Sequence, residues 1–335
     1  TITASNGSNA VSDSSTTNDG TLTVTFTSSE ATTNFALDDI TETNGSLSSF
    51  TQTSTTVYTV TFTPTADGAA TINVAGSTFT DAAGNNNTAA IQFNWTYDAA
   101  GPTMTITASN GSNAVSDSST TNDGTLTVTF TSSEATTNFA LDDITETNGS
   151  LSSFTQTSTT VYTVTFTPTA DGAATINVAG STFTDAAGNN NTAATQFNWI
   201  YDTSAPTMTI TAAEGADGFT SNDSTLALTF TSSRATSNFA VDDITETNGS
   251  LSNFAATSST VYTATFTPAA DGAVTIDVGA AGFADDAGND NTAATQFNWT
   301  YDVTSPIISG TVLDGTDADI DWTNSTSSLT ATWSG

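Results

Sequence analysis

The stretch Thr21-Leu22-Thr23-Val24-Thr25-Phe26-Thr27 alternates apolar and polar side chains with a period of two. A second stretch, Val57-Tyr58-Thr59-Val60-Thr61-Phe62-Thr63, repeats the pattern and ends at Pro64. A period of two is typical of a strand with one buried face, and the Thr, Val and aromatic content favours pleated structure. The two stretches therefore predict β-strands and argue against an amphipathic helix.

Further short runs, separated by clusters of Gly, Asn, Asp and Ser, bring the total to about seven strands in roughly 100 residues, the size of an immunoglobulin-like (Ig-like) β-sandwich. Ile72 and Val74 mark one of these strands. The inward row of the last strand is expected to consist of Ile91, Phe93, Trp95 and Tyr97. No helix is predicted.

One strand pattern changes phase. Phe35 and Leu37 would share a face, but Ile40 is out of register with them. The intervening pair Asp38-Asp39 therefore predicts a bulge or the end of a strand.

The sequence repeats itself on the scale of whole domains. Residues 1–104 recur as residues 105–208 with five substitutions, and a third copy follows at an offset of 100. Units of this size are domains in tandem. The predicted fold class is all-β, with tandem Ig-like β-sandwiches in an elongated rod. The predicted domains are residues 1–100, 101–204 and 205–304, followed by a partial fourth module at residues 305–335.

The predicted joints are short and stiff. Each consists of a few residues with one Pro, at residues 97–103, 201–207 and 301–307. Such segments hold neighbouring domains closer than a flexible tether does. The sequence begins and ends inside strand patterns, so we expect it to be a segment of a longer protein.

Charge is strongly one-sided. Arg234 is the only basic residue against 34 Asp and Glu, and Lys, His and Cys are absent. This charge argues against nucleic acid and anionic membranes as partners and favours divalent cations. The missing residue types remove most nucleophiles, general bases and soft metal ligands, so we expect no enzyme activity and no catalytic residues. No apolar run approaches the ~20 residues of a membrane span, so no direct membrane insertion is expected.

Each copy carries a set of short motifs, which in the first copy are Thr27-Ser28-Ser29-Glu30-Ala31, Asp39-Ile40-Thr41, Asn44-Gly45, Thr63-Pro64, Asp67-Gly68, Asp81-Ala82-Ala83-Gly84-Asn85 and Tyr97-Asp98. These motifs resemble the bacterial Ig-like repeat found in giant secreted adhesins and biofilm-associated surface proteins. The resemblance implies an extracellular location, on the cell surface or in a secreted matrix, with calcium at the domain joints and no catalysis. The last unit contains Ser309-Gly310-Thr311-Val312, Asp314-Gly315-Thr316 and Asp319-Ile320-Asp321. With these motifs, residues 307–335 resemble the start of a fibronectin type III-like module.

A calcium site is predicted at the joint between the first two repeats. In a seven-strand sandwich, the linker residue Asp98 should approach Glu134 and Asp185 of the second copy, with Asn189 nearby. Carboxylate and carbonyl oxygens are the ligands that calcium prefers. The alternative is that Asp-Ala-Ala-Gly-Asn only forms a tight turn. The corresponding acids at the other joints are Glu30, Asp81, Asp202, Asp285 and Asp302.

The second joint has a different composition. Arg234 occupies the position of Glu134, so we expect its guanidinium to replace calcium there and to bridge Asp202 and Asp285. The alternative is an exposed arginine that contributes little.

Two further motifs have open interpretations. A weaker acidic group is predicted at the opposite end of each repeat, either as a second calcium site or as loop acids that cap backbone amides. Its members are Asp39, Asp67, Asp143, Asp171, Asp243 and Asp271. Five Asn-Gly-Ser triplets are formal glycosylation sequons, although Asn-Gly is also a favoured hairpin dipeptide. They begin at Asn6, Asn44, Asn110, Asn148 and Asn248.

The sequence therefore predicts a non-catalytic stalk or fibre segment of a large extracellular adhesin or matrix protein, rigidified by Ca²⁺ at its joints. Its partners would be neighbouring domains of the same long chain. Identical chains in a fibre or matrix and a glycan or surface ligand are further candidates. Two alternatives remain open: a repeated weak carbohydrate- or surface-binding module acting by avidity, and a self-assembling filament or surface-layer subunit.

Overall fold

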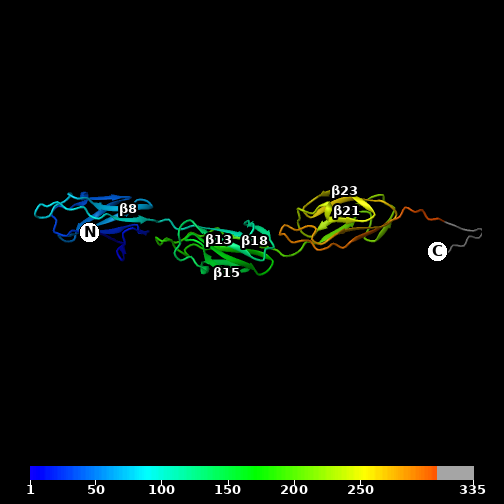
Figure 1. Cartoon of the computed structure of the whole chain (residues 1–335), viewed down its shortest axis with the longest axis horizontal. Helices are drawn as coiled ribbons and strands as arrows, with labels where there is room; N and C mark the ends of the chain where they lie inside the picture. The colour runs from blue at the N-terminus through cyan, green and yellow to red at the C-terminus, as the bar shows by residue number, and fades with distance from the viewer. Residues whose placement is uncertain (308–335) are drawn as a thin grey trace, which may run out of the picture. The chain divides into compact units, whose positions relative to one another are not determined.

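The computed structural model describes residues 1–307, which form three β-sandwiches in sequence order (Figure 1). The chain divides into two compact units. The first contains Thr1–Ser204 with Asp286–Asn289, and the second contains Ala205–Asp285 with the residues from Asp290 onward. Repeats 1 and 2 therefore share one unit. The predicted fibronectin-like module lies outside the described residues, apart from its first few positions.

Repeat 1 consists of two facing sheets. The five-stranded sheet has the order β2-β1-β4-β7-β6 and the four-stranded sheet the order β3-β9-β8-β5. All pairs are antiparallel except β3 with β9, in which Ser15 lies opposite Trp95. The strands are β1 (Ile2–Ser5), β2 (Ala10–Val11), β3 (Ser15–Thr17), β4 (Leu22–Thr27), β5 (Ile40–Thr43), β6 (Gly45–Gln52), β7 (Val57–Pro64), β8 (Gly68–Val74) and β9 (Phe93–Tyr97).

Repeat 2 has the same topology, in the orders β11-β10-β13-β16-β15 and β12-β18-β17-β14. Its strands are β10 (Met104–Ser109), β11 (Ala114–Val115), β12 (Ser119–Thr121), β13 (Leu126–Ser132), β14 (Ile144–Thr147), β15 (Gly149–Gln156), β16 (Val161–Pro168), β17 (Gly172–Val178) and β18 (Phe197–Tyr201).

Repeat 3 has two four-stranded sheets, β19-β21-β24-β23 and β20-β26-β25-β22. The short strand equivalent to β2 and β11 is not formed there, because this copy is shorter near its start. The strands are β19 (Met208–Ala212), β20 (Phe219–Ser221), β21 (Leu226–Ser232), β22 (Ile244–Glu246), β23 (Gly249–Ala256), β24 (Val261–Pro268), β25 (Gly272–Val278) and β26 (Phe297–Tyr301).

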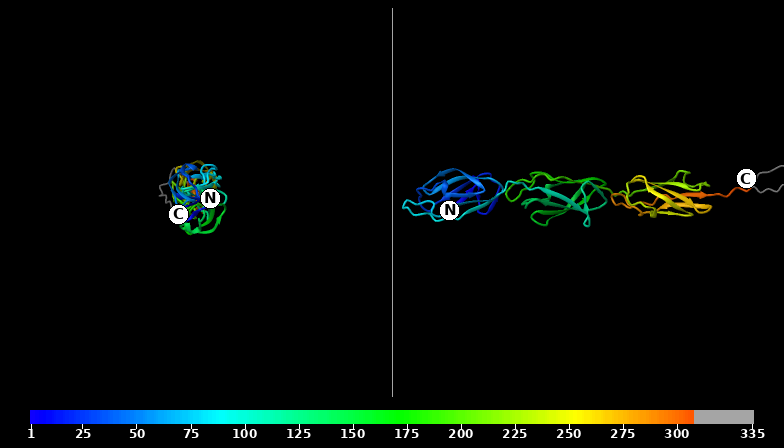
Figure 2. Two further views of the ribbon diagram at one scale, coloured as in Figure 1. Left: turned by 90° about the vertical axis from the view of Figure 1, so that its left-hand side faces the viewer. Right: turned by 90° about the horizontal axis from the view of Figure 1, so that it is seen from above.

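The two stretches that predicted strands form β4 and β7, which pair with each other in the centre of the first sheet. Their apolar rows are buried in the core of the repeat. The strands of each repeat can be followed from a second side in Figure 2. The predicted inward row of the last strand is wrong at one position. Ile91 is 91% exposed, because β9 begins only at Phe93 and the alternating pattern extends back into the preceding loop.

The phase change between Leu37 and Ile40 is explained by a single 3₁₀ turn. The turn η1 (Leu37–Asp39) follows the residues around Phe35 and places Ile40, which is 6% exposed, in the core. The Asp39 carboxylate accepts a hydrogen bond from the amide of Ala36 at 2.9 Å. Equivalent turns are η2 (Leu141–Asp143) and η3 (Val241–Asp243).

Each repeat has its own hydrophobic core, built around aromatic contacts. In repeat 1, Phe62 of the first sheet meets Trp95 of the second edge to face, with ring centroids 4.6 Å apart. The same pair in repeat 2 is Phe166 and Trp199. Such aromatic pairs contribute beyond the area that they bury. No helix in residues 1–307 is long and apolar enough to cross a membrane.

Candidate metal centre at the joint between repeats 1 and 2

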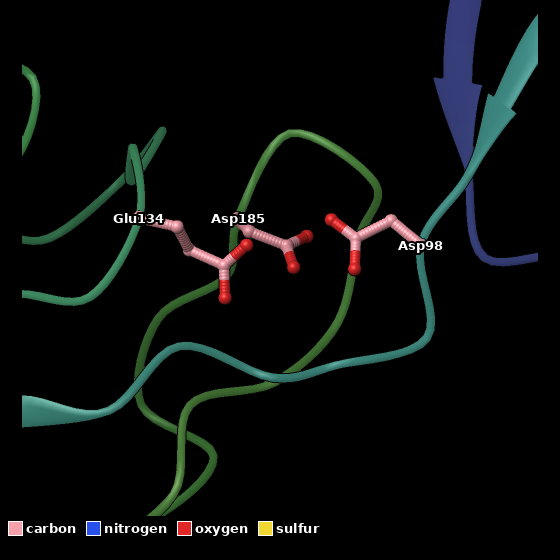
Figure 3. A group of neighbouring side chains, drawn as sticks. All are labelled: Asp98, Glu134 and Asp185. Atoms are coloured by element: carbon pink, nitrogen blue, oxygen red, sulfur yellow. The ribbon is translucent and has the colours of Figure 1, made fainter. Parts of the chain in front are cut away.

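Three carboxylates from two repeats meet at the first joint. One oxygen each of Asp98, Glu134 and Asp185 lies within 4.8 Å of the others. Figure 3 shows Asp98 on the segment that leaves repeat 1 and the other two on loops of repeat 2. Asp185 is 3% exposed, whereas the other two are half-buried. This is the group of acids that the sequence predicted for this joint.

The linker presents Asp98 in a fixed position. Its amide donates to the carbonyl oxygen of Thr17 at 3.1 Å, which extends the pairing of β3 with β9 by one residue. Its Oδ1 accepts a hydrogen bond from the amide of Ala100 at 3.1 Å. The next amide, that of Ala99, donates to Asp67 at 2.9 Å. The first residues of the linker are therefore tied to repeat 1 by two hydrogen bonds, and a third lies within the linker.

The loop that carries Glu134 is anchored on both sides. Ser133 exchanges two hydrogen bonds with Thr103: its amide donates to the Thr103 carbonyl at 2.9 Å, and its hydroxyl accepts from the Thr103 amide at 3.0 Å. On the other side, the hydroxyl of Thr136 lies 2.6 Å from the buried hydroxyl of Tyr162. The loop therefore keeps Glu134 close to the linker.

Asp185 is held by its own turn. Its Oδ1 accepts from the amide of Asn189 at 2.8 Å, and its Oδ2 accepts from the Asn189 side chain at 2.9 Å. Gly188 closes the turn with a φ of +93°, a conformation that favours glycine. This is the turn chemistry that the sequence offered as an alternative to metal binding, and it leaves lone pairs on both Asp185 oxygens for a cation.

The three acids repel one another. Burial, followed by the negative charges of Asp98, Asp185 and Asp67, raises the pKa of the Glu134 carboxyl above its usual value. Desolvation and like charges both disfavour the ionised form. A bound cation would remove this penalty, because it attracts all of the carboxylates at once.

The geometry fits a calcium ion. Calcium binds oxygen at about 2.3–2.6 Å, so two oxygens on one ion lie at most about 5 Å apart. The 4.8 Å limit on the separations in this triad meets that condition. The three carboxylates would supply three to six of the roughly six to eight ligands that calcium takes, and carbonyls and water would supply the rest. Nitrogen and sulfur ligands, which zinc prefers, are absent from the group.

Asn189 has a role that sequence reasoning did not assign. Its side-chain Nδ2 donates to the backbone carbonyl of Asp98 at 2.8 Å, and its Oδ1 accepts from Asn18 of repeat 1 at 3.0 Å. The amide thus links the two repeats directly, with its oxygen already occupied by a donor. Asn18 was missed because the pair is 171 positions apart and Asn18-Asp19 reads as an ordinary turn.

Repeat 1 carries the same residues without the third acid. Asp81 accepts hydrogen bonds from the side chain of Asn85, from the Asn85 amide and from the Ala83 amide, each at 2.8 Å, and these bonds lower the pKa of its carboxyl. Glu30 is exposed. Among residues 1–307, only the first joint brings three acids close enough to share one ion.

The replacement of calcium by Arg234 at the second joint stays a prediction. Asp202 belongs to the first compact unit, whereas Arg234 and Asp285 belong to the second. Asp202 repeats the linker geometry of Asp98, since its Oδ1 accepts from the amide of Ser204 at 3.0 Å. Asp302 does the same with the amide of Thr304 at 2.9 Å.

The structure does not gather the weaker acidic group. Asp39 caps the 3₁₀ turn next to Ile40, and Ile40 pairs with Val74 at the far end of β8. Asp67 precedes the start of β8, and its carboxylate accepts a hydrogen bond from the linker amide of Ala99. The strand register therefore puts the two acids at opposite ends of the sheet. The same separate roles recur in the other copies for Asp143, Asp171, Asp243 and Asp271.

Comparison with known proteins places these observations in a family. The family model described as a bacterial Ig-like domain matches the chain over residues 3–97, 98–200 and 202–301. No curated protein matches the chain.

Solved structures similar to the chain include three at low sequence identity. Invasin, a bacterial integrin-binding protein, is 17% identical, with 83% of this chain and 56% of that chain covered and a TM-score of 0.33. Yersinia pseudotuberculosis InvD is 16% identical, with 87% and 96% covered and a TM-score of 0.37. A Bacteroides ovatus glucan-utilisation protein, SGBP-B, solved with a mixed-linkage heptasaccharide, is 15% identical, with 86% and 65% covered and a TM-score of 0.19.

The chain thus spans 56% of the length of invasin. The assignment of this chain to a family is based on the three matches to the domain model, which together span most of the sequence. The chain belongs to the bacterial Ig-like domain family, as three tandem copies of that domain.

Proposed function

We propose that this chain is a non-catalytic spacer segment of an extracellular bacterial adhesin or matrix protein, with its first joint closed by Ca²⁺. The observation that carries the proposal is the meeting of Asp98, Glu134 and Asp185 from two repeats within 4.8 Å. A cation bound to all three acids ties the linker to the next domain and limits bending between them.

The repeated sequence supports a mechanical role. A catalytic or specific binding site needs to be built only once, whereas length and spacing increase with every added copy. Each copy here has a separate hydrophobic core, so each can fold as its own unit. The short linkers and the amide contact between Asn18 and Asn189 add stiffness that does not depend on metal.

Small-angle scattering of the full chain, with chelator and with millimolar calcium, tests the proposal. Calcium is expected to narrow the range of interdomain distances in the wild-type protein. Glu134→Gln is expected to abolish this response. Glu30→Gln is the matched control, because it changes the same position in repeat 1 outside the triad, and it should respond like wild type.

The proposal fails if calcium leaves the scattering of the wild-type chain unchanged, or if Glu134→Gln responds as strongly as wild type. Saturable binding to a polysaccharide panel without calcium would instead favour the weak-binding module. Ordered polymers of the purified chain in electron micrographs would favour the filament subunit.

A further inference from the structure

Five identical Asn-Gly-Ser triplets occupy two different environments in the fold. Two of them form the turn after the first strand of a repeat, at Asn6 between β1 and β2 and at Asn110 between β10 and β11. In the other three, the asparagine precedes a long edge strand that begins at the glycine, at Asn44, Asn148 and Asn248 before β6, β15 and β23. Since the local sequence is the same, any difference in their chemistry comes from the structure.

The triplets before the edge strands are locked. The Asn44 side chain donates from Nδ2 to the carbonyl of Ala66 at 2.7 Å, and the bond recurs at 2.7 Å in the other two copies. Gly45 is the first residue of β6 and lies opposite Pro64. Its backbone is pressed against the core, since a Cβ there would lie 2.1 Å from the ring of Phe62. The glycine therefore cannot shift without moving the buried ring of Phe62.

The triplets in the first turns differ in the glycine, which lies outside the sheets, whereas the Asn6 side chain is itself hydrogen-bonded through Nδ2 to Asp19. Asn6 is exposed, and no atom lies within 4 Å of the place that a Cβ on Gly7 would occupy. The Asn6 Oδ1 accepts hydrogen bonds from the amides of Ser8 at 3.2 Å and Asn9 at 2.9 Å. The Gly7 amide itself donates no hydrogen bond to any residue in the range 1–307. The turn at Asn110 and Gly111 has the same contacts, at the same distances.

We propose that Asn6 and Asn110 are self-modification sites, which convert to aspartate and isoaspartate in the folded protein while the other three asparagines persist. The Gly7 nitrogen attacks Cγ of Asn6 and forms a new N–Cγ bond. The Cγ–Nδ2 bond then breaks, and ammonia leaves with the proton of the Gly7 amide. Water opens the resulting succinimide: cleavage of the N–Cγ bond gives aspartate, and cleavage at the main-chain carbonyl gives isoaspartate.

The surrounding groups favour this step at the first turns. The two amides on Oδ1 face the oxygen that becomes negatively charged when Gly7 attacks, as donors at an oxyanion do in acyl transfer. Attack requires loss of the glycine amide proton, and a glycine N–H outside the sheet is free to lose it. The rate should therefore rise in proportion to hydroxide concentration.

The modification would change the edge of the sheet. Asn6 now donates from Nδ2 to Asp19 at 3.1 Å. The product is a carboxylate at the same place, so a hydrogen bond becomes a like-charge contact. The short strand β2, which is held to β1 by only Ala4–Val11 and Ser5–Ala10, is expected to detach. Repeat 3 has Glu214 in this region and forms no counterpart of β2.

Peptide mass spectrometry of the full chain, incubated at two alkaline pH values, tests the proposal. The peptides that contain Asn6 and Asn110 should gain the mass difference between an amide and an acid, and the conversion should be faster at the higher pH. Peptides that contain Asn44, Asn148 and Asn248 should remain unchanged over the same period. Incubation in H₂¹⁸O should place the label in the first two sites only.

A denatured sample separates structure from local sequence. In concentrated urea, all five asparagines share the motif Asn-Gly-Ser and should convert at similar rates. The variant Gly7→Ala should slow conversion at Asn6 and leave Asn110 as an internal reference. Equal rates for all five sites in the folded chain would overturn the proposal, and so would conversion of Asn6 and Asn110 only after unfolding.

Discussion

Removing one negative charge from the first joint should stabilise the protein without metal and destabilise it with calcium. In Glu134→Gln, the side chain keeps its shape but no longer repels Asp98 and Asp185. The metal-free variant should therefore unfold at a higher temperature than wild type. With calcium the order should reverse, because a neutral amide is a poorer ligand for a divalent cation than a carboxylate.

The size of the metal-free gain follows from the geometry. At the 4.8 Å limit of the triad, two carboxylates repel by about 0.9 kcal/mol in water and by about 3.5 kcal/mol at an effective dielectric constant of 20. Asp98 and Glu134 are half-exposed, so the value in water applies to that pair. Asp185 is 3% exposed, so its repulsion from Glu134 lies between the two values. The variant should gain at least about 2 kcal/mol, or roughly 10 °C in the transition of a 100-residue domain.

Calcium that binds only the folded protein stabilises it by mass action. At a free concentration about 100 times the dissociation constant, one bound ion stabilises the folded form by about 2.7 kcal/mol. Wild type should show this gain, and Glu134→Gln should lose most of it. Differential scanning calorimetry of the full chain with chelator and with calcium measures both effects, and Glu30→Gln controls for loss of an acid outside the triad.

The stability that Glu134→Gln gains without metal should also depend on pH. The pKa of Glu134 is raised above its usual 4.5, so the folded state holds this proton more tightly than the unfolded state does. The penalty from Glu134 is therefore present above the raised pKa and vanishes below 4.5. Equal melting temperatures for wild type and Glu134→Gln at neutral pH without metal would refute the reasoning.

Three further changes test the fold. Gly149→Ala would place a Cβ 2.1 Å from the ring of Phe166. Urea unfolding should show that it lowers the free energy of unfolding by about 1–3 kcal/mol, the range typical of overpacking. Thr121→Ser should let a hydroxyl reach the Trp199 indole N–H, which is buried without a hydrogen-bond partner, and should stabilise repeat 2 by about 1 kcal/mol in thermal melts. A hydrogen bond from the backbone of β18 lowers the pKa of the Asp117 carboxyl below 3.8, so wild type should lose stability as this carboxylate is protonated below pH 3.8. Asp117→Asn should not show this loss, and melting temperatures measured against pH test it.

The first two of these changes have matched controls in the same chain. Gly124→Ala meets no atom within 4 Å and should leave stability nearly unchanged. Ser221→Thr should destabilise repeat 3, because the Ser221 hydroxyl accepts from the Trp299 indole at 3.1 Å. A Gly149→Ala protein as stable as Gly124→Ala would contradict the packing described here. An acid transition identical in wild type and Asp117→Asn would contradict the assignment to that carboxyl.

Local alternation was sufficient to predict the strands that form the centre of each sheet. Residues 21–27 and 57–63 have a strict period of two, and they pair as β4 and β7 with their apolar rows inward. Alternation failed at Ile91, because the pattern continues beyond the last backbone hydrogen bonds of β9. Periodicity reports which side chains suit a strand face, and it does not report where strand pairing stops.

The candidate site was partly predictable for a similar reason. The order of strands in a sandwich fixes which loops share an end, and that was enough to bring Asp98 towards Glu134 and Asp185. The contact of Asn18 with Asn189 depends on the rotation of one repeat about the other, which sequence spacing does not encode. The supposed grouping of Asp39 with Asp67 failed because strand register separates them along β8.

The most direct test of the central claim is calorimetric titration of the full chain with calcium. The account predicts saturable binding by wild type that Glu134→Gln loses and Glu30→Gln keeps. Absence of saturable binding in wild type, or unchanged binding in Glu134→Gln, would contradict a calcium ion shared by Asp98, Glu134 and Asp185.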